Sequence, residues 1–203
     1  MLLWILPLLI ISNTAMAIEE PTFTLIEKDQ SFELRDYAPK IIAEVEVGGD
    51  MRAASSKGFR LIADFIFGNN TAQDGQAKKI SMTAPVSIEP RAEKIPMTTP
   101  VGVQQSNGAW KVYFVMPHQY AIETLPKPNN SLVRIKQIPR QKFAVIRFSG
   151  LVDEEKMAKK SAELNEWLAN KHLKVIGNLE LARYNPPWTL PFLRRNEVMV
   201  EVE

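Results

Sequence analysis

Apolar and polar residues alternate along much of the chain, which is typical of β-strands with one buried face. The alternation covers Phe32, Leu34 and Ile41–Val47 in the first half, and Val133, Ile135 and Phe143–Phe148 in the second. A further alternating segment, Trp110–Met116, ends at Pro117. These three regions predict a protein rich in strands.

Two other segments repeat apolar residues every three or four positions, which predicts helices. One begins near Met51, and the other spans about Asp153 to Lys171. The first helix has a core-facing stripe and, rotated away from it, a second apolar flank of Phe59, Ala63 and Ile66. Such a flank indicates either a ligand surface or contact with a covering loop. The second helix has one apolar stripe only.

The two halves share a spacing in which an Ala is followed by a Gly six residues later, just before the helix. The spacing consists of Pro39, Ala43 and Gly49 in the first half and of Arg140, Ala144 and Gly150 in the second. We therefore expect an α+β fold, a distorted antiparallel β-barrel of two duplicated strand-strand-helix-strand halves with two flanking helices.

Two similar heptads, Ile80–Val86 and Ile95–Val101, lie between the predicted helices and read as two strands around a turn. Pro cannot donate to a strand ladder, so their prolines should lie at bulges or edges. Glu44 and Glu46, two apart on one predicted strand, are interpreted as a solvated face.

The N-terminus predicts export. Met1–Ile11 is apolar and Ala15–Ala17 follows, as in a signal peptide cleaved before Ile18. The apolar run is shorter than the about 18 residues that span a bilayer, so no stable membrane insertion is expected after cleavage. We expect residues 1–17 to be the signal peptide and 18–203 one domain, periplasmic if the source is bacterial and otherwise secreted.

Composition narrows the classes of function. The chain has no Cys, which excludes disulfides, thiolate ligands and a Cys nucleophile. A net charge of +2 gives no argument for nucleic acid as a partner. Only His118 and His172 could supply imidazole, and neither has a metal-site pattern around it. Nucleophile and phosphate-binding motifs are absent, so we predict neither catalytic residues nor a metal site.

The chain resembles the SOUL haem-binding family over nearly its whole length after residue 17. The resemblance is carried by Phe32–Tyr37, Gly58-Phe59 with Gly68–Asn70, Met82–Val86, Val115–Pro117, Ala182–Trp188 and Arg194–Val198. It implies a distorted barrel that binds haem or another porphyrin in a shallow apolar pocket, beside the first helix and the loop before the last strand.

Carried onto this chain, the resemblance implies a ligand site that coincides with the second apolar flank. Its residues are Arg52, Ser56, Phe59, Ala63, Ile66, Tyr184, Trp188 and Thr189. Asp36 stands where some members of the family place an iron-ligating His. Ser56 and Thr189 stand where cations would meet the haem propionates, and Arg52, Lys57, Arg194 or Arg195 could replace those cations.

The leading expectation is an exported protein that binds haem or a related porphyrin for transport, buffering or delivery. One alternative is a small-molecule hydrolase or tetrapyrrole-modifying enzyme, which a buried carboxylate with a shifted pKa beside Tyr184 would favour. The other is a protein-interaction module, which self-association hiding Phe59 would favour. The sequence identifies no protein partner.

Overall fold

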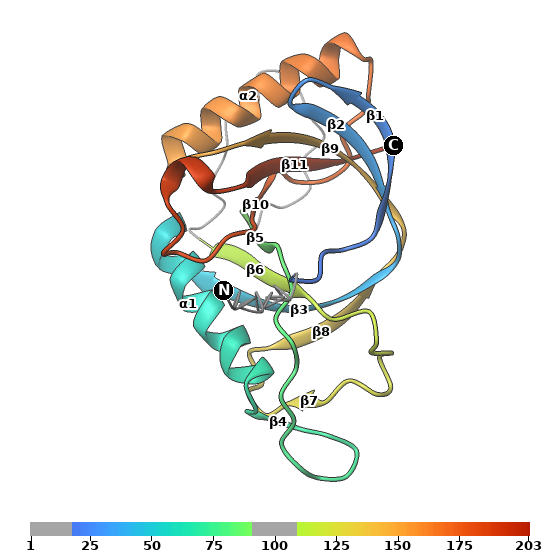
Figure 1. Cartoon of the computed structure of the whole chain (residues 1–203), viewed down its shortest axis with the longest axis vertical. Helices are drawn as coiled ribbons and strands as arrows, with labels where there is room; N and C mark the ends of the chain where they lie inside the picture. The colour runs from blue at the N-terminus through green and yellow to red at the C-terminus, as the bar shows by residue number, and fades with distance from the viewer. Residues whose placement is uncertain (1–17, 91–108) are drawn as a thin grey trace, which may run out of the picture.

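The structure is a computed structural model that describes residues 18–90 and 109–203 (Figure 1). The predicted signal peptide and the second heptad, Ile95–Val101, lie outside the described residues. No helix in the described part of the chain is long and apolar enough to cross a membrane.

Nine described strands form one sheet in the order β1-β2-β9-β11-β10-β5-β6-β3-β8, and each neighbouring pair is antiparallel. They are β1 (Phe23–Asp29), β2 (Phe32–Tyr37), β3 (Lys40–Gly48), β5 (Val86–Pro90), β6 (Ala109–Val115), β8 (Arg134–Ile138), β9 (Gln141–Phe148), β10 (Glu180–Arg183) and β11 (Asn196–Val202). The short strands β4 (Asn70–Thr71) and β7 (Lys127–Pro128) pair separately. The sheet curls into a half-barrel with β1 and β8 at the two ends of the strand order (Figure 1). The expected α+β class is confirmed.

The sheet contains two sets of four strands that are connected in the same way, read inward from its two ends. With β1 set aside, the strand order reads β2-β9-β11-β10 from one end and β8-β3-β6-β5 from the other. In each set the second strand leads into a helix, and the chain returns as the fourth and then the third strand. This order is what two duplicated halves would give, and the duplication itself stays a prediction.

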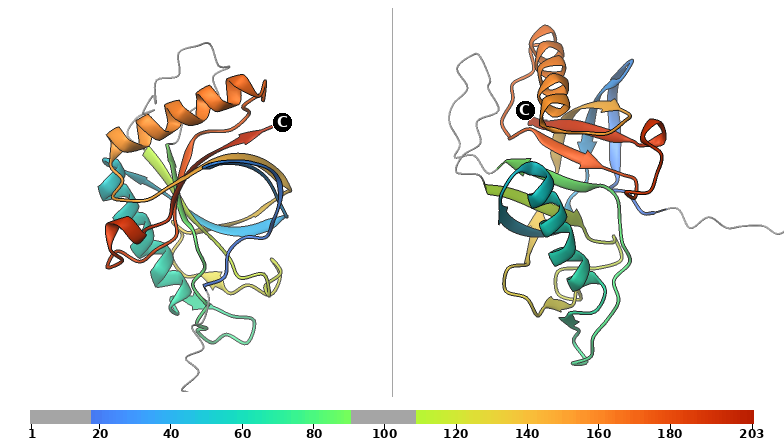
Figure 2. Two further views of the ribbon diagram at one scale, coloured as in Figure 1. Left: turned by 45° about the horizontal axis from the view of Figure 1, so that its top comes forward. Right: turned by 90° about the vertical axis from the view of Figure 1, so that its left-hand side faces the viewer.

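Both helices lie outside the curled sheet (Figure 2). Helix α1 (Met51–Ile66) packs on β3 and β6, and α2 (Glu154–Asn170) packs on β9 and β11. Asp50 and Asp153 cap their N-termini by accepting hydrogen bonds from backbone N–H groups in the first turn. The range predicted for the second helix is confirmed, because Asp153 and Lys171 are the caps of α2.

The predicted strand over the first heptad is wrong for Ile80–Pro85, since β5 begins only at Val86. Hydrogen bonds from this segment go in several directions and not to one ladder. Ile80 N donates to Ile66 O in α1 at 2.8 Å, and Ala84 N donates to Glu19 O at 2.9 Å. The segment therefore ties the end of α1 and the start of the described chain to the sheet.

The two faces of the sheet carry different chemistry. The outer face packs against the helices in the main apolar core. All buried charged side chains of the described chain project from the inner face: Glu33, Arg35, Glu44, Glu180 and Glu197. The interpretation of Glu44 as solvated is wrong, because this side chain is buried with Lys136 Nζ 2.6 Å from its Oε1. The curl of the sheet converts an apparently polar strand face into an interior one.

Candidate functional site

The second apolar flank of α1 is open at one end and closed at the other. Phe59 is 37% exposed, and its ring lies 5.5 Å from that of Phe114. Ala63 and Ile66 are buried, and Ile66 belongs to the main core. The segment after α1 folds back on this end of the helix, through the hydrogen bond from Ile80 N to Ile66 O. Only the Phe59 end of the flank faces solvent.

The loop between β10 and β11 exposes four large apolar side chains within six residues. Trp188 is 82% exposed, Leu190 55%, Phe192 70% and Leu193 62%. Phe192 and Leu193 lie in the short 3-10 helix η1 (Pro191–Leu193). Exposed apolar clusters of this kind are typical of surfaces that bind a ligand or a partner.

The backbone of this loop is held in place although its apolar side chains face solvent. Arg194 donates through Nε to Thr189 O at 2.8 Å and through Nη2 to Pro187 O at 2.5 Å. Gly150 N donates to Pro191 O at 2.9 Å, which ties η1 to the connection between β9 and α2. The exposed side chains are therefore presented by a pre-organised loop.

The start of the loop lies against α1 (Figure 1). Arg183, the last residue of β10, donates through Nη1 to Ser55 Oγ at 3.0 Å. Ser55 and Phe59 are four residues apart and so share one helix face. Arg52 and Ser56, both exposed, lie four residues apart beside that face. The structure thus brings Arg52, Ser56 and Phe59 to the entry of the exposed loop.

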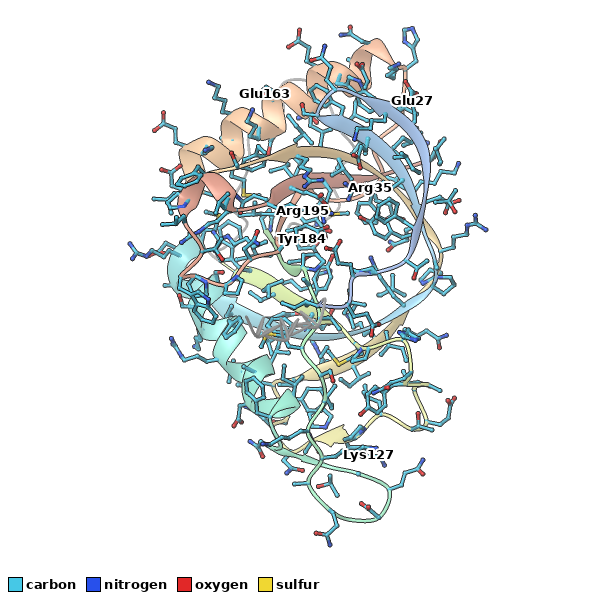
Figure 3. The ribbon with its side chains drawn as sticks, viewed as in Figure 1. Glu27, Arg35, Lys127, Glu163, Tyr184 and Arg195 are labelled. Carbon is cyan, nitrogen blue, oxygen red and sulfur yellow. The ribbon has the colours of Figure 1, made fainter. Side chains whose placement is uncertain are left out.

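Tyr184 lies elsewhere, on the inner side of the sheet (Figure 3). Its hydroxyl donates to Glu197 Oε2 at 2.7 Å, and the Arg195 guanidinium stacks 3.7 Å from its ring centre. Burial raises the pKa of Tyr184 far above its ordinary value. Tyr184 therefore belongs to the interior network and does not join the surface around Phe59.

The interior network is centred on Glu197 and Arg35. Arg35 donates to both carboxylate oxygens of Glu197, at 2.7 and 2.9 Å, and Arg195 Nε donates to Oε1 at 2.9 Å. Burial favours the neutral carboxyl, but the hydrogen bonds from Arg35 and the guanidinium charges outweigh it and lower the pKa of Glu197. A carboxylate with a shifted pKa does lie beside Tyr184. Because it is held ionised by two guanidinium groups, it is suited to a structural role and not to proton transfer.

A second interior pair, Glu180 and Tyr113, was not anticipated from the sequence. The Tyr113 hydroxyl lies 2.8 Å from both carboxylate oxygens of Glu180. Burial, with a contribution from the charge of Glu89, raises the pKa of Glu180 to about 7. Glu180 and Ala182 lie on one face of β10, and nothing in their local sequence indicates that this face is interior.

A cavity of about 310 Å³ lies at one mouth of the curled sheet. Lys40 lines it, with its ammonium 4.8 Å from the ring centre of Tyr37 and 5.4 Å from that of Phe143. His118 also lines it, and its Nδ1 lies 2.9 Å from Glu19 Oε1. Residues 18–90 and 109–203 contain no group of three His, Asp or Glu side chains that could hold a metal ion.

Asp36 forms an ion pair with Arg140. Arg140 donates to its two carboxylate oxygens through Nε at 2.8 Å and Nη2 at 2.6 Å. These hydrogen bonds lower the pKa of Asp36. The other imidazole, His172, is exposed just after α2.

In its described part the protein thus has a curled antiparallel sheet, two outer helices and an exposed apolar loop. A family model described as SOUL heme-binding protein matches residues 18–201. The chain belongs to this family, as its sequence motifs indicated. No curated protein matches the sequence.

Several solved structures share the fold at low sequence identity. The C-terminal domain of EcmrR aligns with a TM-score of 0.61 and 11% identity, covering 85% of this chain and 96% of that one. An uncharacterized conserved protein from Listeria innocua aligns with a TM-score of 0.58 and 12% identity, covering 86% and 93%. A hydrolase from the same organism aligns with a TM-score of 0.56 and 10% identity, covering 88% and 94%. At these identities the likeness concerns the fold alone.

Proposed function

We propose that the protein binds haem or a related porphyrin reversibly, on the surface formed by the Phe59 end of α1 and the β10–β11 loop. The observation that carries the proposal is the fixed loop that exposes Trp188 and Leu190 beyond the Arg183–Ser55 contact with α1, in a chain of the SOUL haem-binding family. Exposed apolar side chains on a pre-organised loop lose little conformational entropy when a flat ligand covers them.

The residues of this surface fit the chemistry of a porphyrin. Haem supplies a planar apolar ring and two propionates. Phe59, Trp188 and Leu190 would contact the ring, with Ser56 and Thr189 at the polar edge. Ala63 and Ile66 are buried and would support the helix face from beneath.

Two of the four candidate cations remain available for the propionates. Arg194 is used by the loop carbonyls, and Arg195 is paired with Glu197 and with Glu20 at 2.9 Å. The side chains of Arg52 and Lys57 are exposed on α1 and form no hydrogen bond or ion pair within the described part of the chain. They would therefore orient the ligand.

The proposed binding is non-catalytic and does not depend on an axial His. Asp36 occupies the position of the family His and is paired with Arg140. Tyr184, the acid or base of the enzymatic alternative, donates to an ionised Glu197. Ring contacts and propionate contacts then supply the affinity, so protoporphyrin without iron should bind about as tightly as haem.

We further propose that residues 1–17 direct export and that the protein carries, buffers or delivers the porphyrin outside the cytoplasm. The apolar run followed by Ala15–Ala17 supports this proposal. N-terminal sequencing of the protein from its native host would test it, with Ile18 as the expected first residue. A mature protein that begins at Met1 would refute it.

The binding proposal is tested by titrating the purified protein with haem and with protoporphyrin IX. We expect a saturable shift of the haem Soret band. Leu190→Ser should weaken binding about thirtyfold, because burial of one Leu side chain contributes on the order of 2 kcal/mol.

Leu132→Ser is the matched control, since Leu132 is 56% exposed and lies in the connection before β8. It should bind haem as the unmodified protein does. No saturable spectral change, or equal effects of the two substitutions, would contradict the proposed surface.

A further inference from the structure

A second cleft, of about 690 Å³, lies at one end of the sheet between the β1–β2 turn and η1. Both of its walls are tied to the end of β9. Arg147 N donates to Ser31 O in the β1–β2 turn at 2.9 Å, and Gly150 N donates to Pro191 O in η1 at 2.9 Å. Because both contacts are between backbone groups, the main chain sets the separation of the two walls.

The lining of this cleft is strongly cationic. It includes four cations, Lys28, Arg147, Arg194 and Arg195, and one carboxylate, Glu33. Glu33 Oε2 already lies 2.6 Å from Arg35 Nη2. Arg195 is neutralised by Glu197 and Glu20, but two of the other cations have no carboxylate partner.

Those two cations are Arg147 and Arg194. The exposed side chain of Arg147 forms no hydrogen bond or ion pair with any described residue. Arg194 donates only to backbone carbonyls of the loop. A guanidinium group presents paired donors that match the two oxygens of a carboxylate. Arg194 already spends its donors on the loop, so Arg147 supplies the unused anion-binding capacity of the cleft.

Apolar side chains stand next to these cations. Phe192 and Leu193 line the cleft and are largely exposed, and Phe148 lines it from β9. Cationic groups beside a small apolar wall complement a ligand that carries one acidic group on an apolar chain. The volume falls within the range of about 300 to 1,000 Å³ that is typical of small-molecule sites.

We propose that this cleft binds an amphipathic carboxylate of the fatty-acid class. Arg147 receives the carboxylate, and Phe192 and Leu193 contact the apolar chain. The site goes beyond the porphyrin surface, because Arg147, which receives the carboxylate, lies on β9 and not on α1.

The test uses 11-(dansylamino)undecanoic acid as a fluorescent probe and its methyl ester as an uncharged control compound. The acid should bind saturably, with the ester at least about tenfold weaker. Arg147→Gln should weaken binding of the acid by about ten- to hundredfold, as expected for the loss of a charged hydrogen-bond partner. Phe192→Ser should weaken both probes severalfold.

Two controls separate this site from the porphyrin surface. Lys159→Gln removes an exposed cation from α2 and Arg52→Gln removes one from α1, and both should leave binding of the acid unchanged. Saturating haem should also leave the acid bound. Thermal unfolding of each variant reports whether it remains folded.

The proposal is overturned if the unmodified protein shows no saturable binding of the acid, or if the ester binds as tightly. It is also overturned if both Arg147→Gln and Phe192→Ser bind the acid normally. Full displacement of the acid by haem would refute a separate site. A protein that binds the acid but not haem would refute only the porphyrin proposal.

Discussion

Replacing Glu180 by Gln should stabilise the protein at pH 8 and leave its stability unchanged at pH 4. Glu180 is only 3% exposed, and the Tyr113 hydroxyl lies 2.8 Å from both of its oxygens. Burial, followed by the charge of Glu89, raises its pKa from 4.5 to about 7, while Lys40, the Tyr113 hydrogen bond and Lys111 act in the opposite direction. The folded protein therefore holds a proton that the unfolded chain releases.

The magnitude follows from proton linkage. Below about pH 4.5 the carboxyl is neutral in both states and contributes nothing to the pH dependence. Between pH 4.5 and 7 the folded state loses about 1.4 kcal/mol of stability per pH unit, because only the unfolded state has released its proton. The penalty reaches roughly 3 kcal/mol and is constant above pH 7. Gln has nearly the same shape and can accept the Tyr113 hydrogen bond, so it should remove this penalty.

Urea unfolding at pH 4, 6 and 8, followed by tryptophan fluorescence, measures the effect. We expect Glu180→Gln to match the unmodified protein at pH 4 and to gain roughly 3 kcal/mol at pH 8, with an intermediate gain at pH 6. Glu166→Gln, an exposed position on α2, should show no gain at any pH. A loss of stability at pH 8 would refute the reasoning, because it would mean that Lys40 and Lys111 more than offset the cost of burying the ionised Glu180.

Three further predictions concern the interior network and the helices. Glu197→Gln should lower the free energy of unfolding in urea by about 3 to 5 kcal/mol, because Arg35 loses a buried partner. An unchanged urea midpoint would contradict the structural role of Glu197. Gly58→Ala should lower the free energy of unfolding by roughly 1 to 3 kcal/mol, since the added Cβ would lie 2.5 Å from Val112 Cβ. A gain in thermal stability would show that the packing around residue 58 can relax. Asp153→Ala should cost about 1 kcal/mol through loss of the N-cap of α2, whereas Asp153→Asn should lose little, and equal losses would rule out capping as the cause.

The sequence predicted the elements whose signals are local. The second helix was placed correctly because its cap and its apolar period lie within one segment. The strand predicted over Ile80–Pro85 was wrong. The hydrogen bonds of that segment go to Ile66 at the end of α1 and to Glu19 near the start of the described chain. Local alternation does not encode such distant partners.

The candidate ligand surface was partly accessible from sequence. The helical period separated Phe59 from the core stripe, and the motifs pointed to the loop that contains Trp188 and Thr189. The period could not show that Ile66 is covered by the following segment. Nor could it show that Arg194 is used to fix the loop, since its acceptors are backbone carbonyls.

By itself, the sequence determined the α+β class, the ends of α2 and the family, because alternation, helical period, caps and motifs are short-range properties. Only the tertiary structure decided which strand faces are interior. The curl of the sheet encloses its inner face, so polar residues that look solvated along the strand become buried. Their partners then come from distant positions, as with Arg35 and Glu197, which are 162 residues apart. The same folding leaves Arg147 without a carboxylate partner among the described residues and opens the cationic cleft beside η1.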